Sequence, residues 1–268
     1  MNIPPQEQQR IGTVYLRVKN LQDQLDFYQR VIGLQVHRQD GATVYLGTGG
    51  ADLLALIDSP QGVRRRGSNG LFHFALLVPT RADLARAVYH LMRSDTRLQG
   101  ASDHIVSEAL YLSDPEGNGI EIYADRPRQQ WYREGKFQLG TLPLDLNDLM
   151  QALPSRTDDT FTLAERTIMG HIHLHVDQIA PAVDFYRDVL GMQVMMQLSS
   201  AAFLSYDGYH HHVGINVWAG QVQHSADTLG LDHATLFLDA DERQHLPDPD
   251  ILSISDPAAN LLHLDNPT

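Results

Sequence analysis

An internal repeat constrains the fold of this chain more than any other feature. The segment that begins at Ile11 returns at Met169 with the same order of residue types. The two copies share an alternating opening, an aromatic pair and a closing glycine: IGTVYLRV, Phe27-Tyr28 and Gly33 in the first, MGHIHLHV, Phe185-Tyr186 and Gly191 in the second. The alternation predicts a strand, and the periodic stretch behind it predicts an amphipathic helix that is capped at Asn20 or Asp177 and ends at the glycine. With the short strands that follow, each copy is a βαβββ module.

Two weaker copies lie between and after these modules. One runs from His73 to Tyr123 and the other from His233 to Leu264. Their ends align, since DPEGNGIE at residues 114–121 matches DPAANLLH at residues 256–263. The last module looks degraded, because residues 239–249 are too short and too rich in proline for the usual helix and its final turn has lost the glycine. The sequence therefore predicts an α+β protein of four βαβββ modules that form two open, barrel-like sheets.

The order of the modules along the chain suggests two domains. Modules one and two occupy residues 9–126, and modules three and four occupy residues 168–268. The polar stretch at 127–167 contains Trp131 and Tyr132, and a short helix is expected near Asp145 to Leu153. We expect this stretch to be a linker that packs on the surface.

Composition limits the classes of function. The chain has 20 Lys plus Arg against 33 Asp plus Glu, and a formal charge of −13 argues against binding of nucleic acid or of an anionic membrane surface. No apolar run approaches membrane-spanning length and the start lacks the regions of a signal peptide, so we expect a cytoplasmic enzyme or binder. Because there is no cysteine, disulfides and thiolate metal sites are excluded, and any metal must use histidine and carboxylate ligands.

A short hairpin carries the main chemical signal. Residues 111–121 read YLSDPEGNGIE, in which the Asp-Pro-x-Gly-Asn run predicts a tight turn, and His104 stands seven residues ahead of Tyr111. Glu121 follows the turn on an apolar strand, where it shares a face with Tyr123. A carboxylate buried on such a strand is costly unless a positive group meets it.

At this point the chain resembles the vicinal oxygen chelate superfamily, which includes glyoxalases, extradiol dioxygenases and bleomycin- and fosfomycin-resistance proteins. The Phe-Tyr-x-x-Val-Leu-Gly and Asp-Pro-x-Gly-Asn-x-Ile-Glu motifs are shared across that superfamily and indicate the fold rather than the reaction. The spacing from His104 through Tyr111 to Glu121 is more specific. It resembles the signature of extradiol ring-cleaving dioxygenases, and the whole organisation is similar to catechol-2,3-dioxygenases of the CatE type. Ser102 departs from the signature, at a peripheral position.

The resemblance implies a metal site between two modules. His73 on the first strand and Glu121 on the last strand of module two would supply two ligands. The first module offers only Thr13 at the equivalent position, whereas the third offers His171. We therefore hypothesise that modules two and three pair, within the chain or across a dimer, so that His73, Glu121 and His171 form a 2-His-1-carboxylate site for Fe(II). Mn(II) prefers similar ligands, and the sequence does not separate the two metals.

The same resemblance implies catalytic roles around the metal. His104 and Tyr111 would hydrogen-bond the two oxygens of a catechol-type substrate. His211, in the run of residues 203–211 that resembles the strand of a second-sphere histidine, would stabilise O2 and later donate a proton. The expected partners are a small aromatic diol and O2, and a homodimer is expected because βαβββ proteins often associate through sheet edges.

Other interpretations remain open from the sequence. If modules three and four pair, His171, His233 and His263 would form a three-histidine site suited to Zn(II). A glyoxalase-like isomerase would need a second glutamate, but Val213 and either Leu54 or Leu56 fall near the places for it.

A metal-free small-molecule binder is the third alternative. Such a binder would need an aromatic cavity wall, for which Tyr15, Phe74, Tyr123 and Trp218 are candidates. The run Arg64-Arg65-Arg66 is most simply a solvated loop, although it could attract an anionic substrate.

Overall fold

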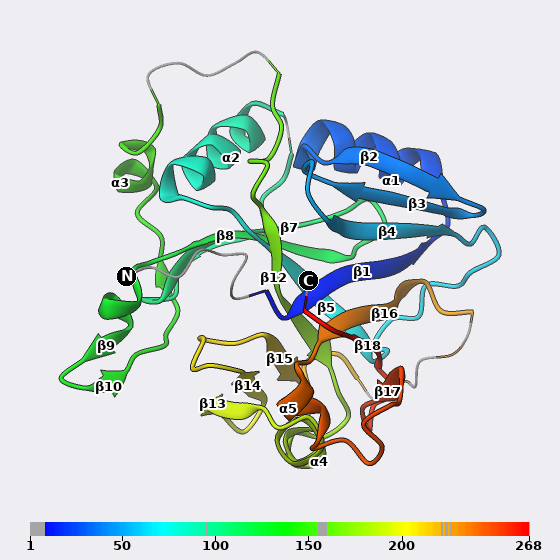
Figure 1. The fold of residues 1–268 in the computed structure, drawn as a ribbon. Coiled ribbons are helices and arrows are strands. Elements are labelled where there is room, and N and C mark those ends of the chain that lie inside the picture. The colour runs from blue at the N-terminus through cyan, green and yellow to red at the C-terminus, as the bar shows by residue number, and fades with distance from the viewer. Residues whose placement is uncertain are drawn as a thin grey trace.

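Two large sheets organise the molecule (Figure 1). The computed structural model describes residues 9–94, 96–154, 160–220, 222, 225 and 227–267. Within these residues the larger sheet contains nine strands, in the spatial order β11 (Leu142–Pro143), β6 (Gly100–Asp103), β7 (Ser107–Ser113), β8 (Gly119–Asp125), β5 (Gly70–Leu77), β12 (Ile168–His175), β15 (Val213–Asn216), β14 (Ala201–Ser205) and β13 (Gln193–Gln197).

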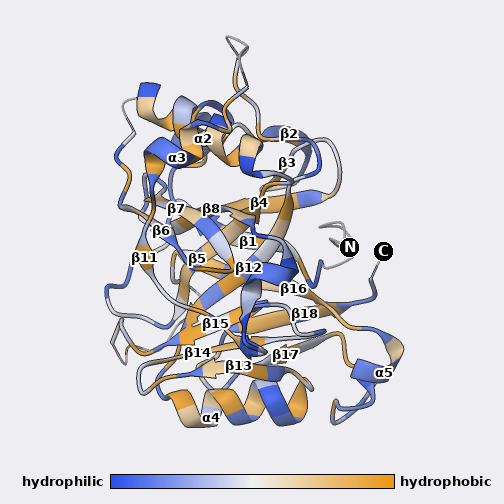
Figure 2. Ribbon diagram, turned by 90° about the vertical axis from the view of Figure 1, so that its left-hand side faces the viewer, coloured by the Kyte–Doolittle hydropathy of each residue, from blue (hydrophilic) through white to orange (hydrophobic). Residues whose placement is uncertain are grey.

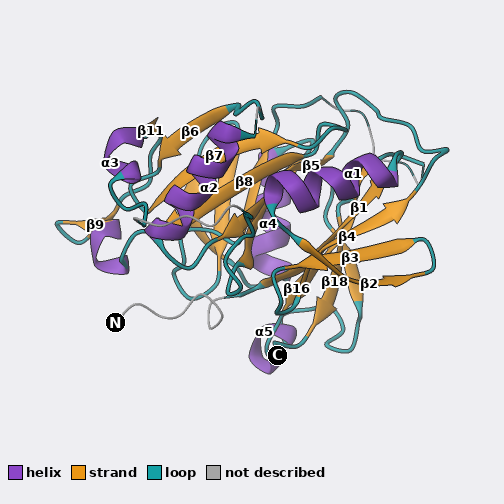
Figure 3. Cartoon of the chain, turned by 90° about the horizontal axis from the view of Figure 1, so that it is seen from above, coloured by secondary structure: helices purple, strands orange, loops and turns teal. Residues whose placement is uncertain are grey.

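The smaller sheet contains seven strands in the described part of the chain. Their spatial order is β17 (Ser253–Ser255), β18 (Leu261–Asp265), β16 (Gly230–Phe237), β1 (Ile11–Val18), β4 (Asp52–Asp58), β3 (Thr43–Gly47) and β2 (Gln35–Asp40). A separate hairpin pairs β9 (Tyr132–Arg133) with β10 (Lys136–Phe137). The predicted α+β fold with two open sheets is confirmed, and the view from above shows the two sheets beside each other (Figure 3).

The pairing of modules follows from two antiparallel contacts. Strand β5 of module two pairs with β12 of module three, and β1 of module one pairs with β16 of module four. Modules two and three therefore pair within one chain, as the hypothesis for the metal site requires. Each large sheet combines one module from either side of residues 127–167, so the ranges 9–126 and 168–268 describe the order of modules along the chain and not the composition of the sheets.

The helices lie on the outer faces of the sheets. The longer ones are α1 (Leu21–Phe27), which continues as a π-helical turn (Tyr28–Ile32), α2 (Arg81–Arg93), and α4 (Ile179–Asp184), which continues as a π-helical turn (Phe185–Val189). Short pieces are a 3-10 turn (Arg128–Trp131), α3 (Leu146–Met150) and α5 (Ala240–Arg243). Helix α2 packs on β8 and α4 on β14 and β15, at opposite ends of the molecule (Figures 1 and 2). No helix in the described ranges is long and apolar enough to cross a membrane.

The helix ends test the predicted caps. Asn20 caps α1 by accepting from the Asp23 amide, and Gly33 ends the first helical segment with a φ of 82°. The predicted cap at Asp177 is wrong, because α4 begins after Gln178, whose side chain makes no capping bond. The Asp177 carboxylate instead accepts a hydrogen bond from Asn69 at 2.9 Å.

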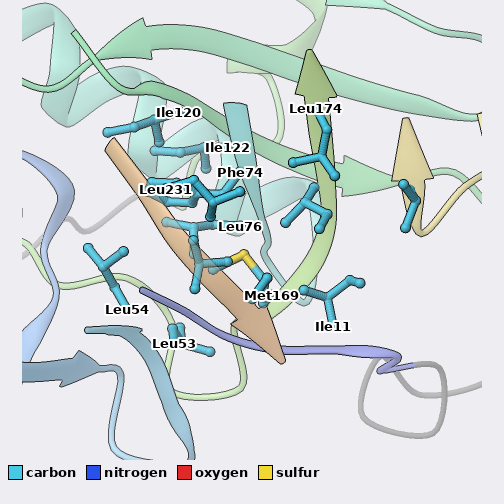
Figure 4. Packing of buried hydrophobic residues seen from close by; sticks show 14 of the residues in the cluster. Ile11, Leu53, Leu54, Phe74, Leu76, Ile120, Ile122, Met169, Leu174 and Leu231 are labelled. Carbon is cyan, nitrogen blue, oxygen red and sulfur yellow. The ribbon is translucent and has the colours of Figure 1, made fainter. Parts of the chain in front are cut away.

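The main core lies between the two sheets. Alternate residues of β5 and β8 face it, as do Met169, Ile172 and Leu174 of β12, where a register shift lies between Met169 and His171. Figure 4 shows Phe74, Ile122 and Met169 pointing toward β16 and β1. Leu54 and Leu231 from the smaller sheet meet them there (Figure 4). Because side chains alternate along a strand, the polar residues between these apolar ones are directed to the opposite face of the larger sheet.

Candidate active site

The predicted turn forms as the sequence indicates and positions the strand behind it. Asp114 Oδ1 accepts from the backbone amides of Glu116 and Asn118 at 2.9 and 2.8 Å, and Gly117 takes the left-handed conformation with a φ of 85°. The returning strand β8 pairs with β7 so that Glu121 lies opposite Tyr111. The local motif therefore fixes which residues of the two strands share the polar face.

Three predicted metal ligands meet on that face. Glu121 Oε2 lies 3.1 Å from His73 Nε2 and 3.1 Å from His171 Nε2, and the two imidazole nitrogens are 3.4 Å apart. The strand register explains the meeting, because Ala75 of β5 is opposite both Glu121 of β8 and His171 of β12. All three side chains are buried, and they form a group that could hold a metal ion.

The donor set fits a divalent transition metal. Bonds of ~2.1 Å at right angles would place donor atoms ~3.0 Å apart, close to the three separations found here. Burial alone would raise the pKa of Glu121, but the imidazoles of His171 and His73 hold this pKa well below its usual range. Burial lowers the pKa of His171 to about 4, although Glu121 opposes the shift. At neutral pH the site therefore offers one carboxylate and a neutral His171 imidazole.

His104 and Tyr111 form a second polar pair on the same wall. The Tyr111 hydroxyl is 2.6 Å from His104 Nε2, and His104 Nδ1 is 2.7 Å from the carbonyl oxygen of Gly140. A carbonyl only accepts, so His104 Nδ1 carries the proton and Nε2 accepts from the tyrosine. Burial and the nearby Glu121 raise the pKa of Tyr111 well above its usual value, which keeps this hydroxyl protonated.

A chain of hydrogen bonds orients His211, the third predicted catalytic residue. Asp125 Oδ1 accepts from His210 Nε2 at 2.9 Å, and His210 Nδ1 is 3.0 Å from His211 Nδ1. Because His210 donates through Nε2, its Nδ1 accepts the proton of His211 Nδ1, and His211 Nε2 is left without a hydrogen. The His211 ring also lies on His171, with ring centroids 4.1 Å apart. Burial, followed by the neighbouring imidazoles, lowers the pKa of His211.

These groups line one cavity of about 990 Å³. His73, Glu121, His104, Tyr111 and His211 all contribute to its wall, whereas His171 lies behind them, 1% exposed.

The linker at 127–167 also reaches the cavity. The prediction that it packs on the surface is incomplete, because Leu139, Gly140 and Thr141 line the wall and Gly140 holds His104.

The aromatic part of the wall differs from the expectation. Of the four aromatic candidates only Trp218 lines the cavity. Phe74 belongs to the core, and Tyr123 is buried with its hydroxyl 2.8 Å from that of Tyr209. Tyr15 lies on β1 in the smaller sheet. Phe72 and Phe203 line the cavity instead, and the rings of both pack against the ring of His173.

Sequence reasoning missed two residues of this site. His173 lines the cavity, 3% exposed, and its Nε2 has no hydrogen-bond partner in the described part of the chain. Its alternation with His171 on β12 was the available signal. Asp125, which holds His210, continues the alternation of Glu121 and Tyr123 on β8, so the same period-2 rule identifies it.

Comparisons with known proteins agree with this geometry. A family model described as the Glyoxalase/Bleomycin resistance protein/Dioxygenase superfamily matches residues 10–122 and 168–242. The chain belongs to this superfamily. The catechol-2,3-dioxygenase of Bacillus subtilis (strain 168) is 40% identical over 249 residues, which cover 90% of this chain and 86% of that protein. This relationship confirms the expectation of a dioxygenase enzyme.

Solved structures of low sequence identity support the superfamily fold. Glyoxalase I of Zea mays superimposes with a TM-score of 0.58 at 14% identity, over 96% of this chain and 92% of that one. The cppA protein of Streptococcus pneumoniae TIGR4 gives a TM-score of 0.59 at 14% identity, over 97% and 98%. At such identities the likeness concerns the fold alone.

The sheet topology separates the alternative three-histidine set, which the sequence left open. His171 lies in the larger sheet, whereas His233 and His263 lie in the smaller one. The His233 ring stacks between Tyr15 and His263, with centroid separations of 3.9 and 3.8 Å. The module pairing expected for that site is therefore wrong, since module four pairs with module one.

The register also bears on a glyoxalase-like ligand set within this superfamily. Glu121 lies opposite Ala75, and Ala75 follows His73 by two residues. The residues that occupy the place of Glu121 are Ala55 in module one and Gly214 in module three. The expected places, Leu54 or Leu56 and Val213, were one residue away. None of these positions carries a carboxylate, so the described residues offer no second glutamate at the matched place.

Proposed function

We propose that this protein is an extradiol ring-cleaving dioxygenase that acts on catechol-type aromatic diols with O2 and uses Fe(II). The observation that carries the proposal is the approach of His73, Glu121 and His171 to within 3.1–3.4 Å of one another beside a large cavity. The name of the Bacillus relative supports the same reaction. Mn(II) prefers the same oxygen and imidazole ligands and fits this donor set equally.

The three ligands would occupy one side of the metal and leave the cavity side for substrate. Fe(II) held by these residues would supply a Lewis-acidic, redox-active centre for the diol and O2. Both oxygen atoms enter the product and the ring supplies the electrons, so the reaction needs no external reductant. The bond that breaks lies next to the diol, and the expected product is an open-chain, yellow compound.

The remaining residues would bind the diol and move protons. The Tyr111 hydroxyl and His104, which bond each other, would hydrogen-bond the diol oxygens, and the carbonyl of Gly140 holds the His104 ring. His211 presents an unprotonated Nε2, so it can accept a proton from the diol and return it to the opened product. The contact of its ring with that of His171, a proposed ligand, supports a role close to the metal.

Metal analysis of anaerobically purified protein tests the proposal, followed by Fe(II) reconstitution and a catechol assay that follows the yellow product. His73→Ala, Glu121→Ala and His171→Ala should each abolish iron binding and ring cleavage while the circular dichroism spectrum stays native. His233→Ala is the matched control, because His233 occupies the position of His73 in the smaller sheet.

Two outcomes would contradict the proposal. If folded wild-type protein binds no metal, the proposed dioxygenase function is wrong and a metal-free small-molecule binder becomes the better hypothesis. If it binds metal and leaves catechols intact, a glyoxalase-like isomerase or lyase is the class to test next.

A further inference from the structure

The cavity wall is positively charged although the chain as a whole is acidic. Acidic residues outnumber Lys plus Arg by 33 to 20 in the sequence. Among the described residues that line the cavity, Glu121 is the one carboxylate, whereas Arg64, Arg65 and Arg66 all contribute to the wall. Because Glu121 is a proposed metal ligand, its charge would be neutralised by the metal. The arginines would then face the substrate without a balancing acid on the wall.

Two of the three arginines have no anionic partner in the described part of the chain. Arg65 is paired with Asp227 at 2.9 Å. Arg64 donates to the side chain oxygen of Asn118 and to the carbonyl of Gly117, both at 2.7 Å, and both acceptors are neutral. The exposed Arg66 has no hydrogen bond or ion pair with any described residue. Arg64 is thus held in place by neutral acceptors, with the buried Asp114 of the same turn as a nearby charge. Among the described residues none pairs with Arg66.

The position of Arg64 relates this charge to the proposed reaction centre. Its two acceptors belong to the turn that leads into β8, and Asn118 precedes Glu121 by three residues, or about 10 Å along a strand. The cavity of about 990 Å³ is at the upper end of the range of ~300–1,000 Å³ typical of ligand sites, and so has room for more than one ring. An aromatic diol with a short acidic side chain would reach from the metal ligands to the arginines.

We propose that Arg64 and Arg66 form an anion subsite and that the preferred substrates are catechols with a carboxylate on a short side chain. This inference rests on the proposed dioxygenase function and specifies its substrate class. Arginine suits the task because its planar guanidinium matches a carboxylate and cannot lose its charge. Since Arg66 is exposed, its contribution is screened by salt and acts on substrate capture more than on the chemical step.

A pair of probes isolates the charge. 3,4-Dihydroxyphenylacetate and its methyl ester share the ring and differ in the anion. The wild type should show a kcat/KM roughly tenfold higher for the acid, which is the effect of one partly screened charge-assisted hydrogen bond. The preference should shrink in about 0.5 M salt, because the Debye length is then only about 4 Å. Arg66→Gln should remove most of the preference and leave the ester nearly unchanged. Arg64→Gln should also remove most of the preference, and because Arg64 bonds the turn before Glu121 it should lower kcat/KM for acid and ester together.

Two further variants serve as controls for the loss of charge. Arg133→Gln removes the same charge from an exposed residue outside the cavity wall and should keep the preference. Arg64→Lys retains the charge beside the turn and should restore most of the preference that Arg64→Gln loses. Equal kcat/KM values for acid and ester in the wild type, or the same loss in Arg133→Gln, would overturn the anion subsite while the dioxygenase proposal stands.

Binding to the metal-free protein separates this subsite from the reaction. Trp218 lines the cavity and is 51% exposed, so its fluorescence reports ligand entry. The acid should quench it at lower concentration than the ester in the wild type, and the difference should vanish in Arg66→Gln. If this holds and no diol is cleaved, the subsite stands and the dioxygenase proposal fails; if acid and ester quench alike, the subsite is wrong whatever the activity.

Discussion

The hydroxyl of Tyr28 donates a 2.9 Å hydrogen bond to Asp114 Oδ2 and joins the helix of module one to the turn of module two. The repeat reproduces the contact, since Tyr186 of module three donates to Asp256 of module four at 3.1 Å. Both pairs are buried. The turn at Asp114 leads into the strand that carries Glu121, whereas the turn at Asp256 leads into a strand outside the candidate metal site. One contact therefore has two structural copies, of which only the first supports a proposed ligand.

Substitution of these tyrosines should separate stability from metal binding. Tyr28→Phe and Tyr186→Phe each remove a buried hydrogen bond to a carboxyl group and should lower the free energy of unfolding by about 1.5–3 kcal/mol in urea titrations. Only Tyr28→Phe should also weaken Fe(II) binding, by about tenfold, because Asp114 anchors the turn before Glu121. Equal metal affinity in the two variants would contradict a role of this contact in positioning Glu121.

Much of the fold could be predicted because its signals are local. The repeat identifies the modules, and the helix at Leu146–Met150 forms where the sequence places it, capped by Asp145. The loss of the predicted cap at Asp177 could not be anticipated, because the competing donor is Asn69, 108 residues away in sequence. Local propensity cannot register a partner that only the tertiary fold brings near.

In the candidate site, too, residues marked by local motifs could be predicted, and contacts between distant segments could not. His73, Glu121 and His171 could be found because each lies at a fixed position of a repeated module. The contribution of Gly140 could not, because nothing in the linker sequence indicates that its carbonyl would reach His104. Register was also missed by one residue at Gly214, since turn lengths and bulges set it and the sequence pattern alone does not.

Removal of the Tyr111 hydroxyl should impair turnover without loss of metal. Tyr111→Phe takes away the group that bonds His104 and faces the proposed diol site, so kcat/KM for catechol should fall about 10- to 100-fold. Iron content and the urea midpoint should stay close to those of the wild type. Tyr132→Phe, at an exposed residue outside the cavity, is the matched control. Loss of iron in Tyr111→Phe would show instead that this hydroxyl acts through the ligand Glu121.

The buried histidines should make the metal-free protein sensitive to acid. Burial lowers the pKa of His171 to about 4 and lowers those of His173 and His211 well below 6.5. Between pH 6.5 and 4 the unfolded chain therefore binds more protons than the folded chain, so stability is complete above pH ~6.5 and is lost as the pH falls through this window.

Urea titrations of the metal-free protein at pH 7 and at pH 5 measure this effect. The wild type should lose free energy of unfolding on the order of 1–3 kcal/mol more than His171→Gln does, because the variant lacks one of the protonatable groups. His245→Gln, at an exposed residue, should behave as the wild type. An identical pH response of wild type and His171→Gln would mean that His171 is already protonated in the folded state.

The hydrogen bonds that run from Asp125 through His210 to His211 lead to a further catalytic prediction. His210→Phe keeps a ring at this position but removes the acceptor of the His211 Nδ1 proton, so the imidazole of His211 loses both its fixed tautomer and its orientation. We expect kcat for catechol to fall about 10- to 100-fold, with iron content retained. His175→Phe is the control, because His175 lines the same cavity and bonds Asn216 instead. If His210→Phe turns over like the wild type, His211 does not depend on this chain. Catalysis would then need only the proximity of His211 to the metal and not the proton placement that the hydrogen bonds impose.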